Sequence, residues 1–290
     1  MKSQALALTL LTASTLLSGC GASLTTITPV TPSAPASLAG NWQMQIQNSS
    51  IGTPATASIL MPGSLSVQGP IVSGTLRVIR FIAGNLTSPC LSFTQGIAFT
   101  GTVDTSGLLT LTSAPFSGSI ATLQLQLPLV NNIGRGTAQI VGGACATPST
   151  SLIAVYVPSV TGTYAGTLSP LLLPGFPGTT NTAGPASITL TQSSANPDGQ
   201  FPVTGTLTVN STSCALAATP LTGTISGLAL SLKGPDPGIT FNNGPNTFPA
   251  ATLSAGAISN SSELIGVTLD AFGNPTTCST GIYRGDFPRQ

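Results

Sequence analysis

The chain has 290 residues, with seven basic and six acidic side chains, no histidine and only 4% charged residues. A nearly neutral protein lacks the electrostatic footprint of a nucleic-acid binder. The lack of histidine excludes histidine-activated nucleophiles and most transition-metal sites. The composition is rich in Thr and includes Gly 33 and Pro 24, but it has very few Glu or Lys. Since strong helix formers are scarce, we expect an all-β protein.

The N-terminal segment follows the plan of an export signal. Lys2 precedes a charge-free apolar run over 5–17, which has the length of a signal-peptide core and is too short to cross a bilayer as a helix. The next residues, Leu17-Ser18-Gly19-Cys20, resemble the lipobox of bacterial lipoproteins. The resemblance implies a signal peptide over 1–19, acylation of Cys20 and anchoring in the cell envelope. Ordinary secretion with an incidental cysteine is the alternative.

The segment over 20–37 is small, uncharged and rich in Thr, Pro and Ser, which is typical of a flexible tether. Each buried methylene of an acyl chain contributes about 0.8 kcal/mol, so several chains on one cysteine would hold a soluble body at a membrane. Gly21 stands where inner-membrane lipoproteins carry Asp. The resemblance therefore implies the outer membrane.

Beyond the tether, the sequence indicates an internal repeat. SLAGNWQMQIQ (37–47) corresponds to SVTGTYAGTLS (159–169), SGTLRV (73–78) to TGTLTV (204–209), and FTGTVDTSGLLTLTS (99–113) to LTGTISGLALSLKG (221–234). The offsets drift between 122 and 133, as loop insertions in one copy would produce. We therefore predict two β domains, over 38–157 and 158–290. Compositional bias is the alternative explanation.

Short apolar and β-branched runs between Gly, Pro and Asn signals predict the strands. We expect them near 41–47, 56–61, 73–81, 96–103, 107–112, 120–127, 136–141, 152–157, 163–169, 186–192, 203–209, 221–226, 228–232, 250–254, 263–270 and 280–285. Asp104-Thr105-Ser106-Gly107 and Asn196-Pro197-Asp198-Gly199 are turn sequences that join adjacent strands. About eight strands per copy predict two tandem antiparallel meander barrels. Paired immunoglobulin-like sandwiches are the alternative.

The cysteines other than Cys20 predict structural bridges, because four remain in an exported chain. The repeat selects Cys90–Cys145 and Cys214–Cys278, one within each copy. Each would close a loop of more than fifty residues, for which chain entropy gives roughly 4 kcal/mol. Without a C-x-x-C motif or histidine, we expect no metal site.

Each copy opens on Gly-x-aromatic, ending at Trp42 in the first and at Tyr164 in the second. This resembles the G-x-W that begins the first strand of lipocalins, whose meander barrels enclose small apolar ligands. The resemblance also implies a late arginine packed over the aromatic ring, a part that Arg284 could take in the second copy. Trp42 and Tyr164 are thus candidates for a ligand contact or, as we favour, for core aromatics at the barrel floor.

The carboxylates are scattered or lie in turns, and no catalytic set, cofactor motif or metal cluster is evident. We therefore expect a non-enzymatic envelope lipoprotein. Its Ser, Thr and Asn faces would contact glycans, envelope partners or other copies. Lipocalin-like binding of a small apolar or envelope-derived ligand is the alternative, and a hydrolase is a distant third.

Overall fold

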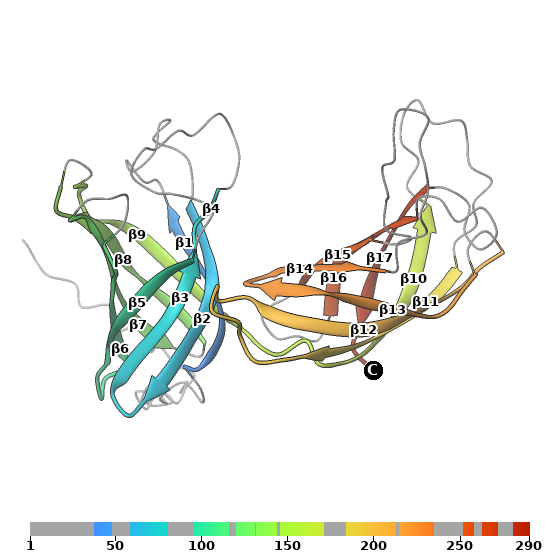
Figure 1. The fold of residues 1–290 in the computed structure, drawn as a ribbon, viewed down its shortest axis with the longest axis horizontal. Coiled ribbons are helices and arrows are strands. Elements are labelled where there is room, and N and C mark those ends of the chain that lie inside the picture. The colour runs from blue at the N-terminus through green and yellow to red at the C-terminus, as the bar shows by residue number, and fades with distance from the viewer. Residues whose placement is uncertain are drawn as a thin grey trace, which may run out of the picture. The chain divides into compact units, whose positions relative to one another are not determined.

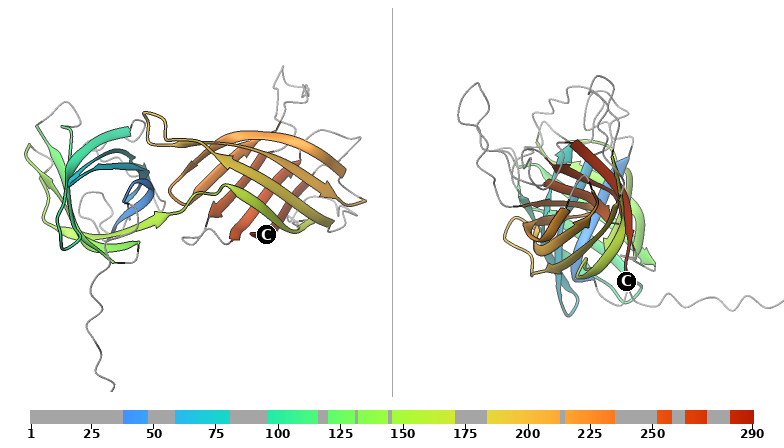
Figure 2. Two further views of the ribbon diagram at one scale, coloured as in Figure 1. Left: turned by 90° about the horizontal axis from the view of Figure 1, so that it is seen from below. Right: turned by 90° about the vertical axis from the view of Figure 1, so that its right-hand side faces the viewer.

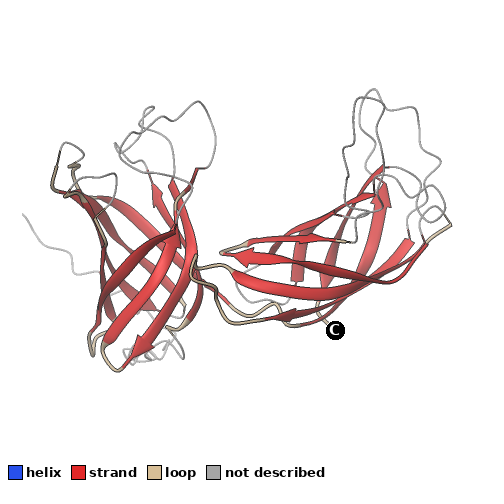
Figure 3. Cartoon of the chain, in the orientation of Figure 1, coloured by secondary structure: helices blue, strands red, loops and turns tan. Residues whose placement is uncertain are grey.

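A computed structural model describes residues 38–47, 59–80, 96–115, 120–130, 132–143, 146–170, 184–212, 215–234, 252–257, 263–271 and 281–290. Within these ranges the regular structure consists of β-strands without a helix (Figure 3). The all-β prediction is confirmed. The five cysteines, and with them the predicted acylation site and both bridges, lie outside the described residues.

The first sheet is an antiparallel meander. Its strands are β1 (Gly40–Gln47), β2 (Ile59–Gln68), β3 (Ile71–Arg77), β4 (Ile79–Arg80), β5 (Gly96–Val103), β6 (Leu108–Ser113), β7 (Thr122–Val130), β8 (Ile133–Val141) and β9 (Thr150–Val157). Their order is β1-β9-β8-β7-β6-β5-β3-β2-β4. Since β1 also pairs with β2, the sheet curls until its hydrogen-bonded order returns to its start (Figure 1).

The second sheet is a closed barrel of eight strands taken in chain order. Its strands tilt as they run around the wall (Figure 2). They are β10 (Gly162–Pro170), β11 (Gly184–Gln192), β12 (Phe201–Asn210), β13 (Ala215–Ser226), β14 (Ala229–Lys233), β15 (Thr252–Ala257), β16 (Glu263–Ala271) and β17 (Gly281–Pro288). Each half is thus one continuous sheet, so the sandwich alternative is wrong.

Every predicted run overlaps a strand, but β2 extends further than its pattern indicates. Pro62 and Gly63 led us to end this strand at residue 61, whereas it continues to Gln68. The ladder between β2 and the β3–β4 segment is interrupted opposite Pro62. Because proline has no N–H to donate, β2 continues past Pro62 but the ladder on this side is broken there.

Both predicted turns are confirmed. The backbone N–H of Gly107 donates to the carbonyl of Asp104 (3.0 Å), and that of Gly199 donates to Asn196 (2.9 Å). Gly107 and Gly199 have φ angles of 82° and 76°. A type I turn followed by a left-handed glycine joins neighbouring antiparallel strands in this way. The first turn links β5 to β6, and the second links β11 to β12.

Inward-facing glycines explain two of the repeated sequence motifs. A Cβ on Gly101 of β5 would lie 1.8 Å from the carbonyl oxygen of Thr110, and one on Gly223 of β13 would lie 1.9 Å from that of Ser231. These separations are far below any allowed contact, so only glycine lets adjacent backbones approach this closely. Glycines at such positions permit the bending that a curled sheet needs.

Candidate functional site

The two Gly-x-aromatic openings have the same local geometry. Trp42 and Tyr164 each show 0% of their surface to solvent. The Trp42 indole N–H donates to the carbonyl of Leu38 (2.8 Å), and the Tyr164 hydroxyl donates to that of Val160 (3.1 Å). In both cases the acceptor lies four residues earlier in the chain. Each aromatic side chain thus fixes the segment that enters its sheet.

A different side chain lies against the opening glycine in each sheet, that of Tyr156 in the first and that of Arg289 in the second. In the first sheet, Tyr156 of β9 pairs with Trp42, with ring centroids 5.5 Å apart and planes at 68°. In the second, Arg289 forms a single backbone β-bridge with Tyr164. The Arg289 guanidinium donates to the backbone carbonyl of Thr161. Burial raises the pKa of Tyr164 above its usual range, and the charge of Arg289 opposes part of that rise.

Arg289, and not Arg284, lies beside the second opening. Arg284 is exposed and pairs with Ser169, near the end of β10, far along the strand from Tyr164. The prediction was wrong because Tyr283, not Arg284, has the inward position in this alternating strand. Arg289 follows β17 and was overlooked because it lies outside the GIYRGDF run.

The inward faces of both sheets carry closely packed apolar side chains. Besides Trp42, the fully buried large residues of the first sheet include Phe99, Met44 and Met61. In the second barrel, the set around Tyr164 includes Tyr283, Phe287 and Leu207. A ligand in either interior would lie against these side chains.

Asn41, the middle residue of the first Gly-x-aromatic, is one of the few buried polar side chains. Its side-chain N–H donates to the carbonyl of Gly227 (2.9 Å), and its amide oxygen accepts from the Gly227 N–H (2.8 Å). The pattern drew attention to the glycine and the aromatic residue, and it contained no signal for this long-range bond.

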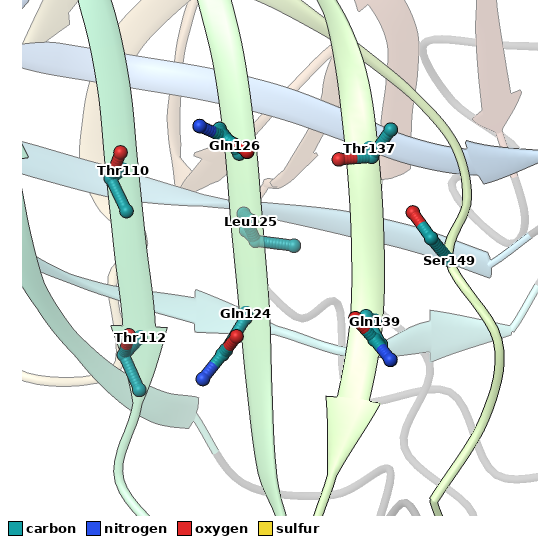
Figure 4. A pocket seen from close by; sticks show the side chains of 8 residues that line it. All are labelled: Thr110, Thr112, Gln124, Leu125, Gln126, Thr137, Gln139 and Ser149. Atoms are coloured by element: carbon teal, nitrogen blue, oxygen red, sulfur yellow. The ribbon is translucent and has the colours of Figure 1, made fainter.

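A hollow of about 250 Å³ lies on the outer face of the first sheet, where β6, β7 and β8 run side by side (Figure 4). Figure 4 shows two glutamines on the middle strand, flanked by threonines on one side and by Thr137 and Gln139 on the other. Apart from Leu125, its lining consists of uncharged polar residues. They are Thr110, Thr112, Gln124, Gln126, Thr137, Gln139 and Ser149.

Strand register arranges these side chains in two rows, which we call the polar belt. Neighbouring strands are about 4.8 Å apart and alternate residues along a strand about 6.8 Å, so hydrogen-bonding groups repeat regularly across the face. The belt consists of Thr102, Thr110, Gln126, Thr137 and Ser151 in one row and Thr100, Thr112, Gln124 and Gln139 in the other. The sequence showed the alternation in each strand but not which strands would adjoin.

Asp104 is held in its turn by local hydrogen bonds. Asp104, the residue of the Asp-Thr-Ser turn, accepts from the Ser106 hydroxyl (2.6 Å) and the Leu108 backbone N–H (2.9 Å). These bonds, led by that from Ser106, lower the pKa of Asp104. Among the residues that the structure describes, no three His, Cys, Asp or Glu side chains are grouped as metal ligands.

The chain matches no protein-family model, and no curated protein is significantly similar to it. In the described part of the chain, no helix is long and apolar enough to span a membrane.

Proposed function

We propose that this protein is a lipid-anchored, non-catalytic envelope module that binds neutral glycans through the polar belt. The observation that carries the proposal is the hollow over β6–β8, whose polar lining consists only of hydroxyl and amide side chains. Such groups both donate and accept hydrogen bonds. They complement the hydroxyls of an uncharged sugar, and the lining has no charged side chain to pair with an ionic ligand.

The affinity expected of one such site is modest. Each neutral hydrogen bond contributes only about 0.5–1.5 kcal/mol, and the lining has no aromatic ring on which a sugar could stack. Many copies anchored in one membrane would bind a polymeric glycan together, and such multivalency raises the overall affinity without new contacts. Anchoring in the membrane would therefore compensate for the weak binding of each single site.

An array of neutral and charged oligosaccharides tests the proposal. The double variant Gln124→Ala/Gln139→Ala removes two amides from the hollow. The matched control is Thr163→Ala/Thr189→Ala, an exposed cross-strand pair on β10 and β11. We expect binding to neutral glycans that is insensitive to salt and falls about tenfold in the hollow variant only. Salt-sensitive binding, or equal loss in both variants, would contradict the proposal.

The anchor is part of the same proposal and rests on the lipobox resemblance at Cys20. Mass analysis of the processed N-terminus tests it. An acylated Cys20 as the first residue supports the anchor, whereas an unmodified cysteine or cleavage elsewhere rules it out.

The proposal includes the two disulfide bridges that the internal repeat selects. In chain order, Cys90 lies between β4 and β5, and Cys145 lies between β8 and β9. Because the meander is antiparallel, both connections leave the same end of the first sheet. Cys214 and Cys278 likewise follow β12 and β16, which end on the same side of the barrel. Peptide mapping without reduction should find Cys90–Cys145 and Cys214–Cys278, and any other pairing would contradict the assignment.

Lipocalin-like ligand binding remains a second candidate because of the arrangement around Tyr164. The late arginine that the lipocalin resemblance implies is matched there by Arg289. Because apolar side chains occupy both interiors, we favour glycan binding at the outer surface over ligand binding inside a barrel.

A further inference from the structure

Three large apolar side chains are exposed at one end of the first sheet. Ile71 begins β3, and Val130 and Ile133 flank the β7–β8 connection. Their exposed fractions are 59%, 52% and 45%. Val130 and Ile133 are directly paired across the two strands, so they present neighbouring β-branched side chains to the outside. We call these three residues the apolar rim.

The described residues of the turns at this end include one ionisable residue, and Arg135, two residues after Ile133, is exposed on the same face of β8. The antiparallel order brings the β2–β3, β5–β6 and β7–β8 connections to the same end of the sheet (Figure 1). Among their described residues, 68–71, 103–108, 130 and 132–133, Asp104 alone is ionisable. Hairpin turns usually carry polar residues, so large apolar side chains exposed beside them suit a contact surface.

The chain enters the first sheet at this same end. Asn41, at the start of β1, pairs with Val157 at the end of β9, and β9 runs toward the end that holds the apolar rim. The residues before β1 are the tether over 20–37, which leads back to Cys20. An acyl anchor on Cys20 would therefore be joined to the sheet at the end that carries the apolar rim.

We propose that the apolar rim contacts the membrane surface and orients the first sheet with its chain-entry end toward the lipid. This inference rests on the proposed acylation of Cys20, because three side chains alone would bind a bilayer only weakly. Once the anchor holds the protein at the membrane, the effective concentration of lipid near the rim is high. The rim then needs to supply only orientation.

Tryptophan quenching by lipid tests this orientation. Two variants of the processed, acylated protein are compared, Val130→Trp and Ile120→Trp. Each is reconstituted in phosphatidylcholine vesicles whose acyl chains carry bromine. Ile120 is a matched control because it is also apolar and exposed (79%) but precedes β7 at the opposite end of the sheet. The native Trp42 is buried and provides a constant, weakly quenched background in both variants.

We expect the added fluorescence of Val130→Trp to be quenched at least twofold more than that of Ile120→Trp. Equal quenching, or stronger quenching at Ile120, would overturn the proposed orientation. Far-UV circular dichroism and Trp42 emission establish that both variants are folded. The N-terminal mass is measured on the same samples. An unmodified Cys20 would overturn the anchor itself, whereas an acylated Cys20 without differential quenching would overturn only the role of the rim.

Discussion

Replacing Tyr164 by phenylalanine tests whether the Gly-x-aromatic opening acts as a structural lock. The substitution removes a single oxygen atom from a side chain that is 0% exposed. That oxygen donates one hydrogen bond, 3.1 Å long, to the Val160 carbonyl. The ring and its packing stay, so the loss is one buried hydrogen bond and the desolvation of its acceptor, together about 1–2 kcal/mol.

Urea denaturation measures this loss. With a typical m-value of about 2 kcal/mol/M, the midpoint should fall by about 0.5–1 M without a change in m. The chain has one tryptophan, and Trp42 belongs to the first sheet, so its fluorescence follows that sheet while far-UV circular dichroism also follows the barrel. An unchanged midpoint by both probes would refute the reasoning, because the hydroxyl would then contribute nothing to stability.

Alkaline pH gives the same substitution a second readout. Burial raises the pKa of Tyr164 and of Tyr283 above the usual value of about 10. A raised folded-state pKa contributes stability that is fully present below the unfolded pKa and is lost as the pH rises through the folded pKa. Above about pH 10, the free energy of unfolding of Tyr164→Phe should therefore fall less steeply than that of the unsubstituted protein. The remaining pH dependence comes from Tyr283.

Two further substitutions test the turns and the bending of the first sheet. Because hydrogen bonds lower the pKa of Asp104, its contribution is present above the unfolded pKa of about 3.9 and is lost as the pH falls through the folded pKa. Asp104→Asn should thus make the melting temperature fall less between about pH 5 and 2 than it does in the unsubstituted protein. The same decrease in both proteins would contradict this assignment. Gly101→Ala should cost about 1–3 kcal/mol, since its Cβ would meet a backbone carbonyl. Thr102→Ala, on the outward neighbour, is the control, and equal stability of the two variants would contradict the close approach.

Much of the fold could be predicted because strand signals are local. The alternation of LTLTS (109–113) and of LQLQLPLV (123–130) marks β6 and β7 directly, with leucines inward and Thr or Gln outward. Turn chemistry is local too, as Asp104 and Asn196 show. The end of β2 was predicted wrongly because Pro62 lacks a backbone N–H. A strand tolerates this where the ladder to its neighbour is interrupted, and the local sequence of β2 does not reveal that interruption.

The candidate site depended on long-range register, which the sequence alone does not provide. Gln124 lies opposite Thr112 on one side and Gln139 on the other, so the polar belt exists only once β6, β7 and β8 are in place. The bond between Asn41 and Gly227 joins residues 186 positions apart. A local pattern contains no information about such a pair.

If ligands bind the outer surface while the protein's own side chains fill both interiors, no small molecule should copurify with the protein, and native mass spectrometry tests this directly. The protein would be released from its own envelope with Cys20→Ser, so that no acyl chain complicates the spectrum. We predict the mass of the bare chain, because apolar side chains such as Trp42 and Tyr164 occupy the inward faces. A discrete added mass that organic extraction removes would contradict the account and show that an interior holds a small apolar ligand.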